Sequence, residues 1–288
     1  MKIVRFSKNG GVAEIGILEG ETVVPLSAIA KDAPTDMKTL VANWDRIAPS
    51  LGGAENSAAA MALCDVKLLA PVDAPEKMMA IGLNYKDHIE ESKSAGVVAP
   101  KDQVWFCKIP SSINDPFGDV EYPRVSEKLD YEVELVAVIG KGGKNISRQD
   151  APGCVFGYAV GNDVSARDWQ LRTQQWVLGK SFDTHAPFGP AITTADEIGD
   201  PHRLQIKCFV NGDLRQNSNT KHLLFNIWDQ IEELSKVMTL KPGDIIFTGT
   251  PGGVGMASAP DGYLKVGDVV RCEIEELGAI ENRIVAQA

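Results

Sequence analysis

The first part of the chain contains three short stretches in which apolar and polar residues alternate. They span residues 2–6, 13–18 and 22–25, and Asn9-Gly10-Gly11 and Glu19-Gly20-Glu21 separate them. Alternation with a period of two is typical of half-buried strands, and glycine-containing breaks of this kind are typical of tight turns. The pattern therefore predicts a small β-meander at the N-terminus.

A helical pattern follows the meander. Residues 36–47 carry apolar residues at helical spacing, whereas residues 49–60 show no period and are predicted to form a connection. We place a domain boundary near residue 72. The expected organisation is a small N-terminal β-rich domain over residues 1–72 and a larger main domain over residues 73–288.

Strand patterns dominate the larger domain. They cover residues 78–83, 104–106, 130–139, 155–162, 206–210, 214–217, 245–247, 269–275 and 280–285. Helical patterns are confined to residues 84–92, to the segment that Asp163 opens, and to residues 225–237. We therefore predict a strand-dominated α+β fold.

Composition and charge exclude several classes of protein. The 288 residues are 44% hydrophobic, enough for one large core with a small appended domain. A net charge of −10 argues against nucleic-acid and anionic membrane partners, since both require basic surfaces. The N-terminus lacks a signal-peptide pattern and no apolar run reaches the length of a membrane span, so we expect a cytoplasmic protein. The five cysteines form no Cys-x-x-Cys pair, which indicates neither a disulfide framework nor a zinc site.

Two glutamates stand one residue apart at the start of an apolar run. In a strand, Glu132 and Glu134 would share one face about 6.5 to 7 Å apart and repel by roughly 2.5 kcal/mol at an effective dielectric of about 20. A solvent-exposed edge strand would be the ordinary explanation, but residues 135–139 lack the polar alternation of such a strand. We therefore expect a cation between the two carboxylates.

A third acid follows the next apolar strand. Asp163 comes directly after residues 155–162, where strand gives way to helix, so carboxylates from two strands could converge on one ion. An all-oxygen set of three acids suits Mg²⁺ or Mn²⁺, with Ca²⁺ as an alternative, rather than Zn²⁺. Three protein ligands would also leave coordination positions open for a substrate.

These segments resemble the fumarylacetoacetate hydrolase family, and the resemblance extends from about Lys77 to Val285. Its motifs are Gly82-Leu83-Asn84-Tyr85-Lys86-Asp87-His88, Asp130-Tyr131-Glu132-Val133-Glu134, the segment from Asp163 to Gln170, Gly179-Lys180-Ser181-Phe182-Asp183, and Thr248-Gly249-Thr250-Pro251-Gly252-Gly253-Val254-Gly255. The resemblance implies a mixed β-sandwich roll for the main domain, a homodimer, and metal binding by Glu132, Glu134 and Asp163.

The resemblance also implies catalytic roles for three further residues. His88 and Glu91 lie three apart, so they would share a helical face, and in relatives such a pair lies on a mobile lid and activates water. Residues 96–101 offer the flexible connection that a lid requires. Lys180 would stabilise an enolate. The ordinary alternatives are a solvated His88–Glu91 ion pair and a Lys180 side chain that extends along the surface to water.

Three more residues are candidates for substrate binding. Arg167 and Gln170 are three apart on the helix that Asp163 opens, with Ser165 as its expected cap, although Arg167 could instead pair with Asp163 or Asp168. Thr250 lies in a glycine-rich loop that has neither the Walker A nor the dinucleotide-binding pattern, and exposed backbone N–H groups there could cradle a carboxylate.

The expected substrate is a small anionic 2-oxo acid. The leading prediction is hydrolysis of a C–C bond in an acylpyruvate-type 2,4-diketo acid, such as a 2,4-diketo-3-deoxy sugar acid, through an enolate stabilised by the metal. Fumarylacetoacetate itself is disfavoured, because the longer fumarylacetoacetases have an aspartate ligand where Asn84 stands here. Oxaloacetate decarboxylation or keto–enol tautomerisation is the alternative reaction. A metal-dependent small-molecule binding protein is the alternative outside catalysis, and the complete set of candidate residues argues against it.

Overall fold

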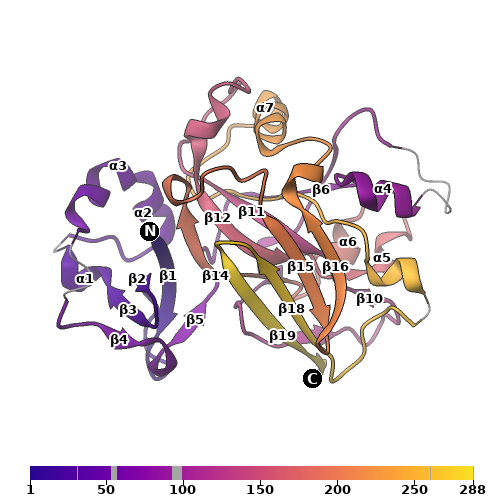
Figure 1. Ribbon diagram of the computed structural model, residues 1–288, viewed down its shortest axis with the longest axis horizontal. Helices are drawn as coiled ribbons and strands as arrows, with labels where there is room; N and C mark the ends of the chain where they lie inside the picture. Colours follow the sequence, from indigo (N-terminus) through magenta and orange to yellow (C-terminus); the bar gives the residue numbers. More distant parts are fainter. Residues whose placement is uncertain (31, 53–56, 93–98, 260, 288) are drawn as a thin grey trace.

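A large mixed β-sheet forms the centre of this computed structural model, which describes residues 1–30, 32–52, 57–92, 99–259 and 261–287 (Figure 1). Its main path runs β4 (Met61–Ala62), β3 (Thr22–Pro25), β2 (Glu14–Glu19), β1 (Lys2–Ser7), β14 (Ala186–Thr194), β12 (Val155–Asn162), β11 (Val133–Ile139), β17 (Ile245–Phe247), β6 (Met78–Gly82) and β7 (Val104–Cys107). Two short strands join from the side, β5 (Lys67–Leu69) at β1 and β8 (Ile113–Asn114) at β14. Neighbours on the main path are antiparallel except β17 and β6.

A second sheet lies over β11 and β12 and forms the other layer of the main domain (Figure 1). Its order is β16 (Asp213–Asn219), β15 (Gln205–Val210), β18 (Val269–Ile274), β19 (Gly278–Ala286) and β9 (Val120–Tyr122). Apolar side chains from both sheets, such as Leu135 and Ile206, share one core. The predicted strand-dominated α+β fold is confirmed.

Strand β11 is buried on both faces. Leu135 and Ala137 belong to the core between the two sheets, whereas Val136 and Val138 belong to the core on the other side of the large sheet. A strand covered on both faces needs apolar residues at every position, which explains why this segment shows no alternation. The strand therefore carries Glu134 into the interior.

The helices are short, with one exception. They are α1 (Leu26–Ile29), α2 (Met37–Ala42), α3 (Trp44–Ile47), α4 (Lys86–Ser92), α5 (Arg167–Gln170), α6 (Val177–Lys180) and α7 (Ile227–Val237). The side chain of Asn226 caps α7 by accepting hydrogen bonds from the Trp228 and Asp229 N–H groups. Within the described ranges, none of the helices combines the length and the apolar character needed to cross a membrane.

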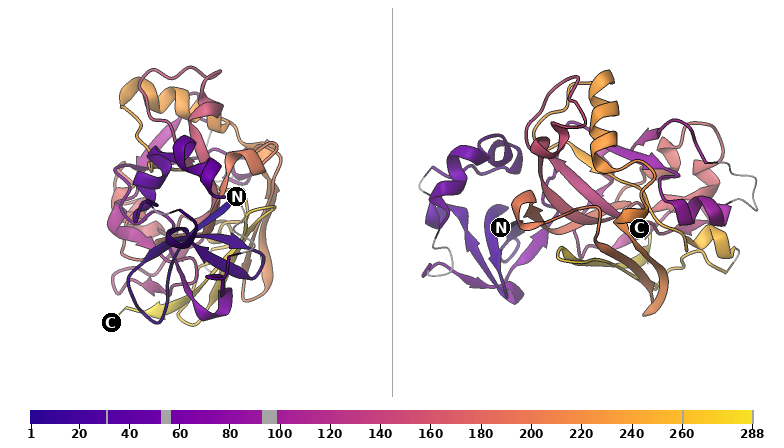
Figure 2. Two further views of the ribbon diagram at one scale, coloured as in Figure 1. Left: turned by 90° about the vertical axis from the view of Figure 1, so that its left-hand side faces the viewer. Right: turned by 45° about the horizontal axis from the view of Figure 1, so that its top comes forward.

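The predicted N-terminal meander is present as β1, β2 and β3, and it continues the large sheet because β1 pairs with β14. Figure 2 shows this part of the chain, in indigo and purple, beside the rest of the molecule. The helical pattern predicted over residues 36–47 is present, but it is divided into α2 and α3 at Asn43.

The strand predicted over residues 130–139 is also interrupted. Residues 129–130 form β10, which pairs with β13 (Ser165–Ala166), and β11 begins only at Val133. The chain leaves one small sheet and enters the large one here. Glu132 consequently lies in the crossing between two strands, and Glu134 lies within β11.

Candidate active site

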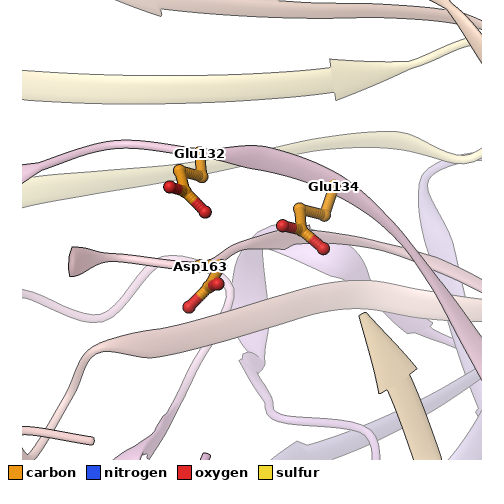
Figure 3. Close-up of side chains that lie close together, drawn as sticks. All are labelled: Glu132, Glu134 and Asp163. Atoms are coloured by element: carbon orange, nitrogen blue, oxygen red, sulfur yellow. The ribbon is translucent and has the colours of Figure 1, made fainter. Parts of the chain in front are cut away.

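Three buried carboxylates converge where β11 begins and β12 ends. Val133 of β11 pairs with Asn162 of β12, and the Asp163 N–H donates to the Glu132 carbonyl at 2.8 Å, so this antiparallel register places Asp163 beside Glu132. One oxygen from each of Glu132, Glu134 and Asp163 lies within 4.8 Å of the others. Figure 3 shows the three carboxylates facing a common space. The predicted grouping of these acids is therefore present.

Two buried lysines neutralise part of this charge. The Lys180 Nζ lies 2.8 Å from Glu132 Oε2 and 2.7 Å from Asp163 Oδ2, so one ammonium group bridges two of the acids. The Lys108 Nζ lies 2.6 Å from the other Asp163 oxygen. With a side chain only 2% exposed, Lys180 does not extend to solvent, and the surface alternative for it is wrong.

Arg167 binds a different pair of acids from those expected. Its Nε donates to Asp130 Oδ2 at 2.8 Å, and its Nη1 lies 2.6 Å from Glu132 Oε1 and 2.9 Å from Gln170 Oε1. The alternative pairing with Asp163 or Asp168 is therefore wrong. The Arg167 Nη2 is buried without a hydrogen-bond partner in the described part of the chain.

The acids differ in how readily they ionise. Burial opposes ionisation of Glu132, but Lys180 and Arg167 outweigh it and lower the pKa of Glu132 to about 2. Burial raises the pKa of Glu134 well above its ordinary value, and the neighbouring charges of Asp163 and Glu132 raise it further. The Gly249 N–H donates to Glu134 Oε2 at 2.7 Å but does not offset these effects.

This set of residues fits a hard divalent cation. Four buried acids, including Asp130, face the three buried cations Lys108, Arg167 and Lys180, so the cluster carries a formal charge of −1 when all are ionised. A divalent cation would change that charge to +1, which favours an anionic ligand. Carboxylate oxygen donors from three side chains are the donors that Mg²⁺ and Mn²⁺ prefer.

His88 and Glu91 belong to α4, and His88 lines the same cavity as Glu132 and Glu134. The His88 Nδ1 is 3.6 Å from Glu91 Oε2, slightly beyond hydrogen-bonding range, and the His88 residue is only 8% exposed. The Glu91 carboxylate also accepts the Gly253 N–H at 3.0 Å, which holds α4 against the glycine-rich loop. Of the connection predicted over residues 96–101, residues 96–98 lie outside the described residues.

A cavity of about 150 Å³ lies within the site. Its wall includes seven of the nine residues predicted from the sequence, namely His88, Glu132, Glu134, Arg167, Gln170, Lys180 and Thr250, together with apolar side chains such as Ile81, Leu171, Trp176 and Met256. The Thr250 hydroxyl already has protein partners, because it donates to the Val133 carbonyl and accepts from Gln216 Nε2. Its role in the site is therefore to support the loop at least as much as to contact a ligand.

The segment after Asp163 differs from its prediction. Residues 165–166 form β13, the helix α5 begins only at Arg167, and no side chain caps it. The Ser165 hydroxyl donates to the Asp163 carbonyl instead, so the predicted Ser165 cap is wrong. Arg167 and Gln170 nevertheless share one face of α5 and both reach the cavity.

Sequence reasoning missed Asp130 and Lys108 as parts of the site. Asp130 belongs to the motif that contains the glutamates, but nothing in the local pattern indicates its partners. Lys108 follows an apolar strand, where a lysine is ordinarily exposed, yet its side chain is fully buried. The apolar neighbours of Lys108 were the available signal for burial.

Comparison with known proteins identifies the family. The model described as "Fumarylacetoacetate (FAA) hydrolase C-terminal" matches residues 77–285, and the model described as "Rv2993c-like, N-terminal" matches residues 1–71. The chain is 44% identical over 291 residues to the mitochondrial oxaloacetate tautomerase fahd2 of Xenopus laevis, covering 99% of this chain and 90% of the relative. It is 43% identical over 302 residues to the fumarylacetoacetate hydrolase domain-containing protein 2 homolog of Dictyostelium discoideum, covering 99% and 97%.

A solved structure supports the same relationship. Maleylpyruvate hydrolase from Sphingobium sp. SYK-6, in complex with manganese(II) and pyruvate, superimposes with a TM-score of 0.85 at 33% identity and covers all of both chains. The buried acids and the Lys180 ammonium group that bridges two of them lie within the segment that the family model matches. The chain belongs to the fumarylacetoacetate hydrolase family.

Proposed function

We propose that this protein is a divalent-metal-dependent oxaloacetate keto–enol tautomerase. The observation that carries the proposal is the lining of the cavity, which brings His88 together with Lys180, Glu132 and Glu134. A 2-oxo acid bound between them would meet a group that can move a proton and a cation that can stabilise an oxyanion. The 44% identity to an oxaloacetate tautomerase supports this reaction over the hydrolysis preferred from the sequence.

The size and charge of the cavity support a small dicarboxylate. A cavity of about 150 Å³ is the volume that holds a molecule the size of benzene, so a four-carbon acid suits it better than a large acylpyruvate. The Arg167 Nη2 is buried and has no hydrogen-bond partner among the described residues, so it can supply a donor for a substrate carboxylate, because a guanidinium group binds carboxylates through its fork of N–H groups.

Tautomerisation moves one proton between C3 and the oxygen on C2. His88 removes the proton from C3 of the ketone, and the negative charge that develops on the C2 oxygen is stabilised by the Lys180 ammonium group. A solvent proton then reaches that oxygen and completes the enol, while His88 releases the proton from C3 to solvent. The reverse sequence restores the ketone. Mg²⁺ or Mn²⁺, with Ca²⁺ as an alternative, would be held by Glu132, Glu134 and Asp163 and would supply Lewis-acid polarisation of the 2-oxo group.

Hydrolysis of an acylpyruvate-type 2,4-diketo acid is the second candidate. The position of Glu91 beside His88 favours it, because a carboxylate that orients an imidazole is suited to activating water. The structural relative in complex with pyruvate is a hydrolase, which also supports hydrolysis as a candidate reaction. Decarboxylation of oxaloacetate needs only stabilisation of the resulting enolate and remains a third reaction of the same site.

Three assays on one preparation distinguish these reactions. The purified protein is incubated with Mg²⁺ and either enol oxaloacetate, keto oxaloacetate or an acylpyruvate. Decay of enol absorbance reports tautomerisation, pyruvate formation from oxaloacetate reports decarboxylation, and loss of the diketone absorbance reports hydrolysis. Rapid enol decay with little pyruvate formation is the expected result. Acylpyruvate hydrolysis without enol decay would favour the second candidate, and ligand binding without any turnover would favour a binding protein.

We also propose that this chain forms a homodimer. Light scattering on the purified protein measures it directly, since a dimer has twice the mass of the 31.1 kDa chain.

A further inference from the structure

Asp130 is fully buried and binds two separate parts of the cavity wall. Its Oδ2 accepts from Arg167 Nε at 2.8 Å and from the Met256 N–H at 2.9 Å, and both Arg167 and Met256 line the cavity. Its Oδ1 accepts from the Gly255 N–H at 2.7 Å and from its own chain neighbour, the Tyr131 N–H, at 2.8 Å. Both oxygens are thus occupied by protein donors, so Asp130 lies behind the wall of the cavity.

We propose that Asp130 is a positioning residue that directs the Arg167 guanidinium toward the substrate carboxylate. The same carboxylate also fixes the end of the glycine-rich loop. The inference rests on the proposed function, because it concerns the ligand of that site. It assigns to Asp130 a role that does not include metal binding or proton transfer.

The backbone already places the two residues together. In the β10–β13 ladder Asp130 pairs with Ser165, and the Arg167 N–H donates to the Lys128 carbonyl at 2.9 Å. This pairing brings the Asp130 carboxylate level with the side of the guanidinium that carries Nε. The bond at Nε leaves Nη1 for Glu132 and Gln170, and it leaves Nη2 buried without a partner among the residues that the structure describes.

Charge explains why Asp130 is needed in addition to Glu132. A guanidinium group near one carboxylate tends to bind it with two parallel N–H bonds. If Asp130 were uncharged, Arg167 would turn toward Glu132 and present two of its nitrogens to it. The donor left for a substrate carboxylate would then be lost. Asp130 therefore keeps Arg167 bound to two acids, Asp130 and Glu132, at the same time.

The loop contact adds a second, independent constraint. A Cβ on Gly255 would lie 2.6 Å from Asp130 Oδ1 and 2.3 Å from the Gly262 carbonyl, so only glycine allows the loop backbone to approach this closely. The glycine-rich loop also carries Gly249, which binds Glu134, and Gly253, which binds Glu91. Asp130 fixes the far end of that loop.

A double-mutant cycle with Arg167 tests the proposal, with pyruvate in the presence of Mg²⁺ as the probe ligand. Asn at position 130 keeps the size but presents an NH₂ group to donors, and Met at position 167 removes the guanidinium at similar volume. Asp130→Asn and Arg167→Met should each weaken pyruvate binding about tenfold or more in calorimetry, and the double variant should be little weaker than either single variant.

Asp168→Asn is the matched control. Asp168 is an acid on the same helix as Arg167, but it accepts from the Ser126 hydroxyl and the Glu127 N–H instead. This variant should bind pyruvate as the wild type does. Wild-type affinity in Asp130→Asn, or losses in the two single variants that multiply in the double variant, would overturn the proposal.

Two further outcomes are also decisive. If Asp130→Asn fails to fold, the double variant should recover folding, because it no longer buries a guanidinium that has lost its Asp130 partner; failure of both would mean that Asp130 only supports the loop. If the wild type itself does not bind pyruvate, the enol-decay assay still tests the proposed function separately, and the melting temperatures of the metal-free variants test the inference. Non-additive losses in that cycle support the Asp130–Arg167 unit, and additive losses contradict it.

Discussion

Lys180 and Asp163 form a buried ion pair in which Nζ lies 2.7 Å from Oδ2, and the same ammonium group lies 2.8 Å from Glu132 Oε2. One cation therefore holds two of the three candidate metal ligands while its residue also lines the cavity. The Asp163 and Glu132 charges raise the pKa of Lys180 although burial opposes this, so the side chain stays protonated and acts as a fixed positive charge.

Replacing Lys180 should therefore affect catalysis more than substrate affinity. Lys180→Met is expected to lower kcat for oxaloacetate tautomerisation by about 10² to 10³, the usual effect of removing one stabiliser of a developing oxyanion, with a smaller change in KM. Steady-state kinetics at saturating Mg²⁺ provide the measurement.

Lys108→Met is the matched comparison for that variant. Lys108 binds the other oxygen of Asp163 and lies behind the cavity wall, so its loss should lower stability more than kcat. Near-native kcat in Lys180→Met would remove Lys180 from the mechanism.

Stabilisation by the metal should depend on pH through Glu134. The pKa of Glu134 is raised in the folded protein by burial and by Asp163 and Glu132. The folded metal-free protein thus holds this proton more tightly than the unfolded chain does. The resulting stability is present below the ordinary pKa of 4.5 and is lost as pH rises through the raised value.

A cation bound to ionised Glu134 would offset that loss, so the rise in Tm caused by Mg²⁺ should grow as pH increases above 4.5. Thermal melts with and without Mg²⁺ across this range measure it. In Glu134→Gln the Mg²⁺ effect should be small at every pH. An equal Mg²⁺ effect at all pH values in the wild type would argue against Glu134 as a ligand.

The roles of His88 and Glu91 should separate by reaction. His88→Ala is expected to lower tautomerisation by about 10² or more, because the proposed base at C3 is lost. Glu91→Ala should lower acylpyruvate hydrolysis by about as much as His88→Ala if the pair activates water, and the double variant should be little worse than either. Oxaloacetate decarboxylation should fall far less in all three variants.

Lys86→Ala is the control on the same helix, since Lys86 is exposed and should leave all three rates unchanged. Equal losses in all three reactions for His88→Ala and Glu91→Ala would mean that the pair orders α4 and does not take part in proton transfer.

Two adjacent glycines test the contact between α4 and the loop. Gly253 has a φ of +94°, and a Cβ there would lie 2.1 Å from the Arg215 carbonyl, whereas a Cβ on Gly252 would make only ordinary contacts at 3.5 Å. Gly253→Ala should therefore lower stability by about 1 kcal/mol or more and weaken the bond to Glu91, while Gly252→Ala should change stability little. Chemical denaturation of both variants provides the comparison, and equal losses would show that the loop is not constrained at Gly253.

The residues that the sequence predicted best are those placed by local geometry. Glu132, Glu134 and Asp163 lie at the ends of two apolar strands that pair with each other, so strand periodicity and an antiparallel register suffice to bring them together. The asparagine–glycine turn between β15 and β16 is equally local, because Asn211 and Gly212 both take the positive φ that the turn requires.

The features that the sequence could not supply depend on distant partners. Asp130 meets Arg167 across 37 positions and Lys108 meets Asp163 across 55 positions, and nothing within a strand or helix period connects such pairs. The interruption at Tyr131 and Glu132 has the same origin, since β10 and β11 pair with different strands. The sequence predicts one strand because no glycine or proline separates Asp130 from Val133.

The decay of enol absorbance tests most directly whether this site interconverts the keto and enol forms of oxaloacetate. The wild type with Mg²⁺ should accelerate the decay, chelation should return it to the uncatalysed rate, and Glu134→Gln should remain near that rate even with Mg²⁺. Equal decay with and without the folded, Mg²⁺-loaded wild type would contradict the claim.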